Sequence, residues 1–183
     1  ESAEVAALST NQLQALSANQ FKAFATEDVA ALTTAQVAAL TTDQVKAMTS
    51  AQVAALSSGQ VGRLTSDQVA VMSTEQVAAI DSGDIASLRL DSAAALTPDQ
   101  IKAMSTGQIS SLTSSQVRQL STVQIDALKT NQVANLTTGQ VSSLNATQVS
   151  ALSTAQVKAL ATNQFASLTG APQLNANCFV LAA

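Results

Sequence analysis

The sequence predicts an all-α solenoid of about twenty short helices, with one capped helix in each eight-residue repeat. Three observations predict it: a strict period in the apolar residues, a helix-capping motif in nearly every repeat, and charges sorted by helix end. The period is plain in residues 32–56, LTTAQVAALTTDQVKAMTSAQVAAL, where one phrase occurs three times. We call each repeat an octad and number its positions from the apolar residue before the Ser/Thr pair, so that Leu32 is position one.

The apolar period excludes one continuous helix and excludes a strand. Positions one and six are apolar in all 20 octads that begin between Leu8 and Leu160. In a continuous helix this stripe would drift by about 80° per octad and soon face water. In a strand the two positions are five residues apart and would point to opposite faces. The two rows are therefore the predicted core of a stacked structure, with Leu32, Val37, Leu40, Val45, Leu56 and Leu64 as representatives.

A helix that begins afresh in every octad agrees with the pattern. Thr33 and Gln36 form a Ser/Thr-x-x-Gln capping box, in which the hydroxyl and the amide each satisfy a backbone N–H of the first turn. Leu32 and Val37 stand at the two positions of a hydrophobic staple. Position five is Gln in 17 of the 20 octads. The predicted capping residues are Thr33, Gln36, Thr41, Gln44, Gln52, Gln60 and Gln68.

Charges and proline support a helix start at position three. Position four, in the first turn, carries acidic residues such as Asp43 and Glu75 and no basic residue. Positions seven and eight carry bases such as Lys46 and Arg118, with Asp126 as the acidic exception. This is the sorting that a helix dipole favours. Pro98 stands at the first helical position, where the missing N–H costs nothing.

One octad cannot bury enough apolar surface to offset the entropy of ordering it, so octads must stack on their neighbours. The natural arrangement is two antiparallel helices per coil, 16 residues, in about ten coils; three helices per coil is the alternative. Residues 1–168 form the predicted solenoid. Residues 169–183 break the period and are expected to be a C-terminal cap or a tail, with Cys178 as a small buried apolar residue.

The period is irregular in residues 80–96, IDSGDIASLRLDSAAAL. Arg89 replaces the capping Ser/Thr there, and acidic side chains gather around it. Two interpretations stand: a joint, bend or small contact site made by Asp81, Asp84, Arg89 and Asp91, or neutral drift in a redundant array.

The composition argues against catalysis and against several partners. With no His, Tyr or Trp and a single Cys, the chain offers no histidine-dependent catalytic arrangement, no convincing metal site and no cofactor site, so we expect no enzyme. A net charge of −4 without a basic patch predicts no nucleic-acid partner. No apolar run reaches the roughly 18 residues needed to span a bilayer, so we expect no membrane insertion.

Two functions remain. The first is a structural spacer or stalk, for which a redundant array of low charge is suited. The second is a binding surface for ice or a polysaccharide, made of stacked hydroxyls. Position two, however, also holds Asp81, Arg89, Lys129 and Asn145, which favours a capping role for its Ser and Thr residues over a regular hydroxyl lattice.

The phrase LTTAQVAALTTDQV resembles the octapeptide arrays, L-[ST]-[ST]-x-Q-V-x-A, of large bacterial secreted or surface proteins. These include adhesin-like proteins and the outer region of flagellin-type filament subunits. The resemblance extends from Leu8 to Leu168. It implies an extracellular or bacterial cell-surface location, and a stalk or filament-decorating role. The partners it implies are further copies of the chain, in an oligomer or filament, or other cell-surface components.

Overall fold

The protein is described by a computed structural model that covers residues 2–169, which contain twenty α-helices of 4 to 8 residues, one 3-10 helix and no strand. The predicted all-α array with one short helix per octad is thereby confirmed. The predicted cap or tail, apart from the backbone of Thr169, lies outside the described residues, as does Cys178.

The chain divides into two compact units, Glu1–Leu96 and Thr97–Ala183. The helices of the first unit are α1 (Ser2–Ala7), α2 (Thr10–Ala15), α3 (Ala18–Lys22), α4 (Thr26–Ala30), α5 (Thr34–Ala39), α6 (Thr42–Ala47), α7 (Ser50–Ala54), α8 (Ser58–Val61), α9 (Ser66–Val71), α10 (Thr74–Ala79), η1 (Ile85–Ser87) and α11 (Leu90–Ala94). Those of the second are α12 (Pro98–Ala103), α13 (Thr106–Ser111), α14 (Ser114–Gln119), α15 (Thr122–Asp126), α16 (Thr130–Ala134), α17 (Thr138–Ser143), α18 (Ala146–Ser150), α19 (Thr154–Lys158) and α20 (Thr162–Thr169).

Consecutive helices are joined by a corner of extended backbone. Before α5 the capping residue Thr33 has φ −69° and ψ 157°, and after it Leu40 has φ −56° and ψ 138°. Thr41, which caps α6, is extended again, so positions one and two make the whole corner. No residue in the described part of the chain has a positive φ. This corner is shorter than the loops of most antiparallel helix pairs, so the chain turns instead of reversing.

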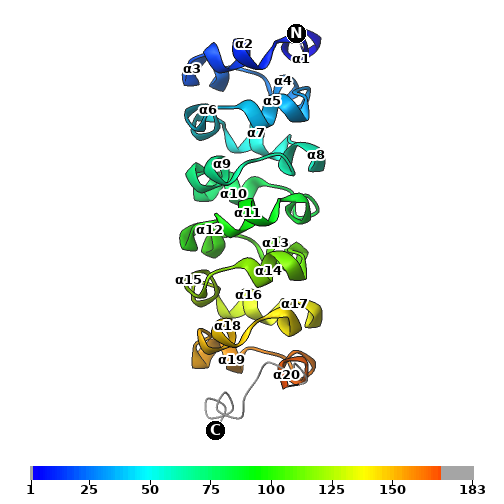
Figure 1. The fold of residues 1–183 in the computed structure, drawn as a ribbon, viewed down its shortest axis with the longest axis vertical. Helices are drawn as coiled ribbons and strands as arrows, with labels where there is room; N and C mark the ends of the chain where they lie inside the picture. The colour runs from blue at the N-terminus through cyan, green and yellow to red at the C-terminus, as the bar shows by residue number, and fades with distance from the viewer. Residues whose placement is uncertain (1, 170–183) are drawn as a thin grey trace. The chain divides into compact units, whose positions relative to one another are not determined.

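The coil therefore contains three helices and 24 residues, and the expectation of two antiparallel helices per coil is wrong. In the first unit α1, α4, α7 and α10 pack one on the next, as do α2, α5, α8 and η1, and as do α3, α6, α9 and α11. The second unit repeats this with α12, α15 and α18, with α13, α16 and α19, and with α14, α17 and α20. Figure 1 shows the short helices of each unit stacked coil upon coil. We call each such stack of helices a column.

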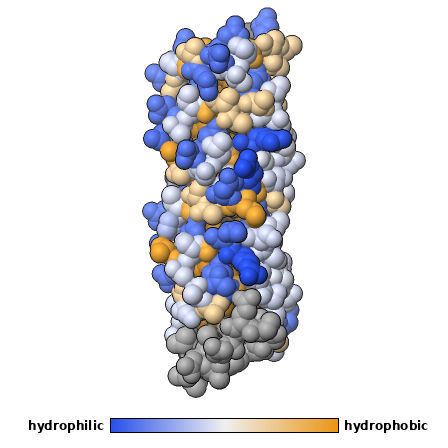
Figure 2. Space-filling view, viewed as in Figure 1, coloured by the Kyte–Doolittle hydropathy of each residue, from blue (hydrophilic) through white to orange (hydrophobic). Residues whose placement is uncertain are grey.

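The core of each unit is a thin rod of position-one and position-six side chains. Leu32, Val37, Leu40 and Val45 are at most 4 % exposed, and Leu56 and Leu64 are equally buried. Positions three, four and seven face outward. On the face drawn in Figure 2, apolar residues appear in small separate areas among hydrophilic ones. Most of the large apolar side chains are therefore buried between stacked coils.

We expect that removal of one whole octad leaves the first unit folded, because every octad makes the same contacts whichever column it occupies. Deletion of residues 33–40 removes a single octad and moves each later octad by one column. Residues 24 positions apart then still occupy the same octad position, so apolar residues still stack on apolar residues. Deletion of residues 33–36 alone instead places polar residues at core positions. Urea unfolding followed by circular dichroism should show a cooperative transition for the first deletion and loss of helix for the second. Equal damage from both would contradict the interchangeability of octads.

Candidate functional site

The candidate functional feature is the row of position-five glutamines, because large polar side chains are buried there in coil after coil. In the first unit the glutamines from Gln36 to Gln76 are at most 3 % exposed. Position five is the third residue of each helix, directly before the buried position six, so its side chain points toward the coil interior. Buried amides cost free energy unless they are hydrogen-bonded. The partners of these amides therefore decide what the row does.

One half of each amide caps its own helix. The Gln68 Oε1 atom accepts from the Thr65 N–H at 2.9 Å, and the Thr65 hydroxyl accepts from the Gln68 N–H at 3.3 Å. Thr33 with Gln36 makes the same pair of bonds at 2.7 and 3.2 Å. The same reciprocal capping pair joins Thr41 to Gln44 and Thr49 to Gln52. At Ser57 the Gln60 Oε1 atom accepts from both the N–H and the hydroxyl, and that hydroxyl accepts no bond from the Gln60 N–H.

The other half of the amide reaches the preceding coil. Gln68 Nε2 donates to the carbonyl oxygen of Leu40 at 2.7 Å and to that of Val37 at 3.0 Å. These carbonyls lie at the C-terminus of α5, 28 and 31 residues earlier in the chain. The N-terminus of α9 therefore sits against the C-terminus of α5, four helices earlier, and the two corners stack on each other.

This intercoil bond repeats along both units. In the first unit Gln36 donates to Val5 and Leu8, Gln44 to Leu13 and Leu16, Gln52 to Lys22 and Phe24, Gln60 to Val29 and Leu32, and Gln76 to Val45 and Met48. In the second unit Gln132 donates to Ile101 and Met104, Gln140 to Ile109 and Leu112, Gln148 to Val117 and Leu120, Gln156 to Ile125 and Leu128, and Gln164 to Val133 and Leu136.

Glutamine is the side chain that satisfies both ends of this corner. Its oxygen accepts from the capping N–H, while its NH2 group donates to two carbonyls that their own helix leaves short of donors. A glutamate would accept the capping bond equally well, but its carboxylate has no donor and would face the negative end of another helix. No buried side-chain nitrogen or oxygen in the described residues lacks a partner. The row thus joins the coils without leaving a polar group unpaired.

The irregular octad, residues 80–87, departs from this scheme. Asp84 takes the glutamine position, and the octad forms the 3-10 helix η1 in place of an α-helix. Gly62 ends α8 in the coil before, and a Cβ atom there would lie 2.9 Å from the Ser87 carbonyl oxygen. The two irregularities are therefore complementary, since the missing side chain at Gly62 makes room for the backbone of the altered octad.

The next octad keeps half of the glutamine's role. The Ser92 hydroxyl donates to the Leu64 carbonyl at 2.7 Å, 28 residues earlier, as a glutamine would. It does not reach back to the capping residue Arg89, whose side chain also makes no cap bond. Arg89 instead pairs with Asp91 at 3.2 Å, and both are exposed. In the described residues no ion pair links Arg89 to Asp81 or Asp84.

Electrostatics mark Asp84 as the unusual charge of this region. Burial, and secondarily the neighbouring negative charge of Asp81, raise the pKa of the Asp84 carboxyl above its ordinary value. Glu75 shows the opposite effect in an ordinary octad, where its own backbone N–H and the hydroxyls of Ser73 and Thr74 lower the pKa of its carboxyl. The charged form is thus favoured for Glu75 at position four and disfavoured for Asp84 at position five.

Sequence reasoning identified the glutamine as a cap but missed its bond to the neighbouring coil. A signal was available: capping boxes accept Glu as readily as Gln, yet no octad from Leu8 onward has Glu at position five. The importance of Gly62 was also missed. Its contact with Ser87 joins residues 25 positions apart, which nothing local indicates.

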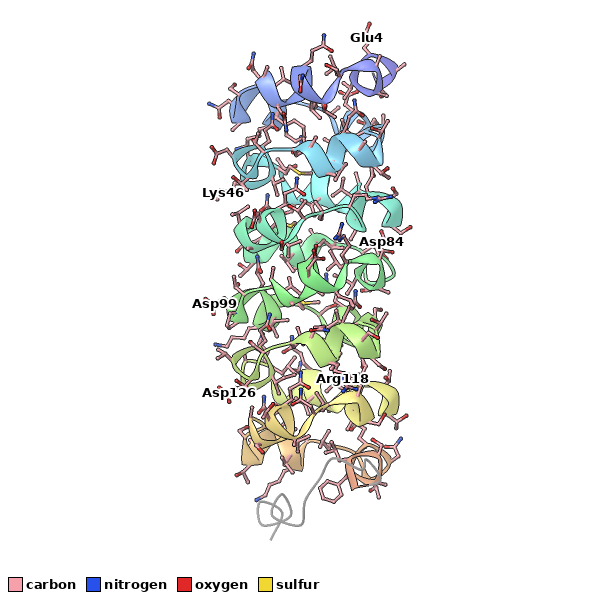
Figure 3. All side chains as sticks on the ribbon, viewed as in Figure 1. Glu4, Lys46, Asp84, Asp99, Arg118 and Asp126 are labelled. Carbon is pink, nitrogen blue, oxygen red and sulfur yellow. The ribbon has the colours of Figure 1, made fainter. Side chains whose placement is uncertain are left out.

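The remaining polar groups are dispersed. The charged side chains labelled in Figure 3, such as Lys46, Asp99 and Asp126, lie on the outside of the coils of their own units. The described residues contain no group of three or more His, Cys, Asp or Glu placed to hold a metal ion. None of the helices between Ser2 and Thr169 combines the length and the hydrophobicity needed to cross a bilayer.

Comparison with known families agrees with the repeat. The sequence profile of the ALTTAQ repeat matches five overlapping segments, residues 1–34, 21–58, 54–82, 77–114 and 106–138. Together these segments span more than half of the chain, which therefore belongs to the ALTTAQ repeat family. No curated protein matches the chain significantly.

The two halves of the glutamine's role can be separated by mutation. Thr65→Ala removes only the reciprocal cap and should lower the free energy of unfolding by about 1 kcal/mol. Gln68→Glu keeps the cap acceptor but leaves two carbonyls without their donor and buries a charge, which should cost roughly 3 kcal/mol or more at neutral pH. Urea unfolding at pH 7 measures both. If Gln68→Glu lowers the free energy of unfolding by no more than Thr65→Ala does, the intercoil bond contributes nothing to stability.

Asp84 should make the stability of the first unit depend on pH. Its pKa is raised in the folded chain, so the folded state holds the proton more tightly than the unfolded state. Stability contributed by this group is therefore lost as pH rises from the ordinary aspartate pKa of 3.8 through the higher pKa of the folded chain. Asp84→Asn should remove this pH dependence of the free energy of unfolding. Asp43→Asn, at an exposed first turn, should leave it unchanged. Urea midpoints measured across this range test the difference, and identical slopes for both variants would refute it.

Proposed function

We propose that this chain is a non-catalytic structural domain, an extended spacer or stalk in a bacterial surface or secreted adhesin-like protein. The observation that supports it most is the repeated glutamine bond between coils. Each coil is attached to the one before by the same short list of contacts, so a unit can be lengthened by whole octads without a new design. Such modularity is useful for setting a distance.

The charge and polarity of the outer surface support the same role. Position-two hydroxyls, such as those of Thr33 and Thr65, accept from a backbone N–H of their own helix and are therefore used internally. The charged side chains are dispersed over the outward positions. A spacer needs solubility and few specific contacts, and both follow from this surface.

A binding surface for ice or a polysaccharide is the second candidate, and one observation favours it. In the second column of the first unit, position three is a hydroxyl in every coil, and these hydroxyls are not the caps of their helices: Thr10, Thr34, Ser58 and Ser82. The outer domain of a flagellin-type filament subunit is a further alternative, suggested by the resemblance of the octads alone.

The spacer proposal is tested by lengthening the chain. Insertion of a second copy of residues 33–56, one full coil, after Leu56 should increase the maximum dimension measured by small-angle scattering by about 8–10 Å, the spacing of packed helices. The inserted chain should also gain helix in proportion. A Gly/Ser insertion of equal length at the same place is the control and should add no helix. An unchanged dimension for the coil insertion would refute the spacer role.

The proposed location needs a separate measurement. Antibodies raised against the octads should label intact cells that produce the parent protein. Labelling only after the cells are made permeable would contradict a surface role but would leave the scattering result intact.

A further inference from the structure

The octad that begins at Leu144 departs from the common pattern at two polar positions. Residues 144–151 read LNATQVSA, with Asn145 at position two and Thr147 at position four. Among the octads that begin between Leu8 and Leu160, no other has Asn at position two and no other has Thr at position four. Asparagine is a good helix cap, so Asn145 alone assigns nothing. With Ala146 and Thr147, however, it forms Asn-x-Thr, the acceptor sequence of N-linked glycosylation.

The hydrogen bonds of the Asn145 amide are made by its oxygen and leave its nitrogen unused. Oδ1 accepts from the Gln148 N–H at 2.9 Å, which caps α18, and from the Thr147 hydroxyl at 2.6 Å. The Nδ2 atom has no hydrogen-bond partner in the described residues. A sugar in N-linked glycosylation is joined to this nitrogen. Capping and glycosylation therefore need different atoms of one side chain, and a sugar on Nδ2 leaves the cap in place.

The backbone around Asn145 is an accessible corner between α17 and α18. Asn145 is extended, with φ −83° and ψ 168°. Ala146 and Thr147 are exposed, and Asn145 is half-buried. Position two is exposed also where further coils follow in the same unit, as at Thr33 and Thr65, so access does not depend on the place of the octad in the array. A surface corner is the structural context in which an acceptor sequence is expected.

Other asparagines in the described residues are less suited to this chemistry. Those at position four stand directly before position five, so the second residue after each is apolar and no acceptor sequence forms. These are Asn11, Asn19, Asn131 and Asn163. Asn135 begins a second acceptor sequence with Leu136 and Thr137, but its Nδ2 atom donates to the Asn131 carbonyl at 2.8 Å and Leu136 is buried. The free amide nitrogen therefore distinguishes Asn145.

We propose that Asn145 accepts an N-linked sugar from a glycosyl diphosphate, whose diphosphate is carried by a nucleotide or by a lipid. The Nδ2 atom bonds to the anomeric carbon as the bond from that carbon to the diphosphate oxygen breaks. The diphosphate leaves with the bonding electron pair, and one proton passes from Nδ2 to a base of the transferase, so nothing is oxidised or reduced. This inference rests on the proposed surface or secreted location, because such acceptors are typical of secreted proteins.

The experiment is peptide mass spectrometry of the chain isolated from the cells that produce the parent protein. The peptide that contains Asn145 should carry the added mass of sugar, and fragmentation should place that mass on Asn145. A preassembled oligosaccharide indicates the lipid-linked donor, whereas a single sugar residue indicates the nucleotide-linked donor. Asn145→Ser installs one of the ordinary caps of the array and should lose the added mass completely.

Proline at position three supplies a matched pair of variants. Ala146→Pro keeps Asn145 and Thr147 but places Pro inside the acceptor sequence, where it prevents modification. Pro98 shows that the first helical position tolerates this residue, and the extended backbone of Asn145 suits the residue before a proline. Thr154→Pro makes the same change at the start of α19, outside the acceptor sequence. The first variant should lose the added mass and the second should keep it, while both unfold cooperatively in urea.

Three outcomes would overturn the proposal. The first is a chain recovered from the cell surface with no sugar on Asn145. The second is sugar on Asn135 alone, which would show that the free nitrogen does not select the acceptor. The third is an equal effect of the two proline variants on the added mass. If antibodies label intact cells while Asn145 is unmodified, this inference fails and the proposed surface location stands.

Discussion

The structure depends on one buried amide at each corner. A position-five glutamine such as Gln68 accepts from the N–H that begins its own helix and donates to the carbonyls that end a helix of the preceding coil. It therefore satisfies backbone groups that a short helix leaves unpaired at both of its ends. Helices of 4 to 8 residues are only marginally stable alone, and this bond connects each of them to a helix of the preceding coil.

The same bond organises the charges and dipoles of each unit. Because the N-terminus of a helix lies against the C-terminus of the helix four octads earlier, opposite ends of two dipoles meet at each stacked corner. A neutral donor satisfies the carbonyls at the point of contact, while acidic residues stand one position earlier, on the outside of the first turn. Glu75 and Asp84 illustrate the contrast, since the pKa of the first is lowered and that of the second is raised.

The irregular octads show how much variation this scheme tolerates. Ser92 keeps the bond to the preceding coil and gives up the cap, whereas Asp84 belongs to an octad that becomes a 3-10 helix packed on α8. Gly62 accommodates the altered backbone of that octad. The glutamine bond is therefore dispensable in single octads, provided that the neighbouring coil adapts. This agrees with a role in which overall continuity matters more than any one site.

The sequence by itself determined the local structure: the helix in each octad, its cap at Thr33 and its equivalents, the apolar rows through Leu32 and Val37, and the absence of strands from residues 2–169. These follow from interactions within about eight residues. The number of helices per coil, the second bond of Gln68 and the fit of Gly62 to Ser87 were decided only by tertiary structure. Each depends on residues 24 to 31 positions apart, and a pattern that is identical in every octad cannot tell which distant octad becomes the neighbour.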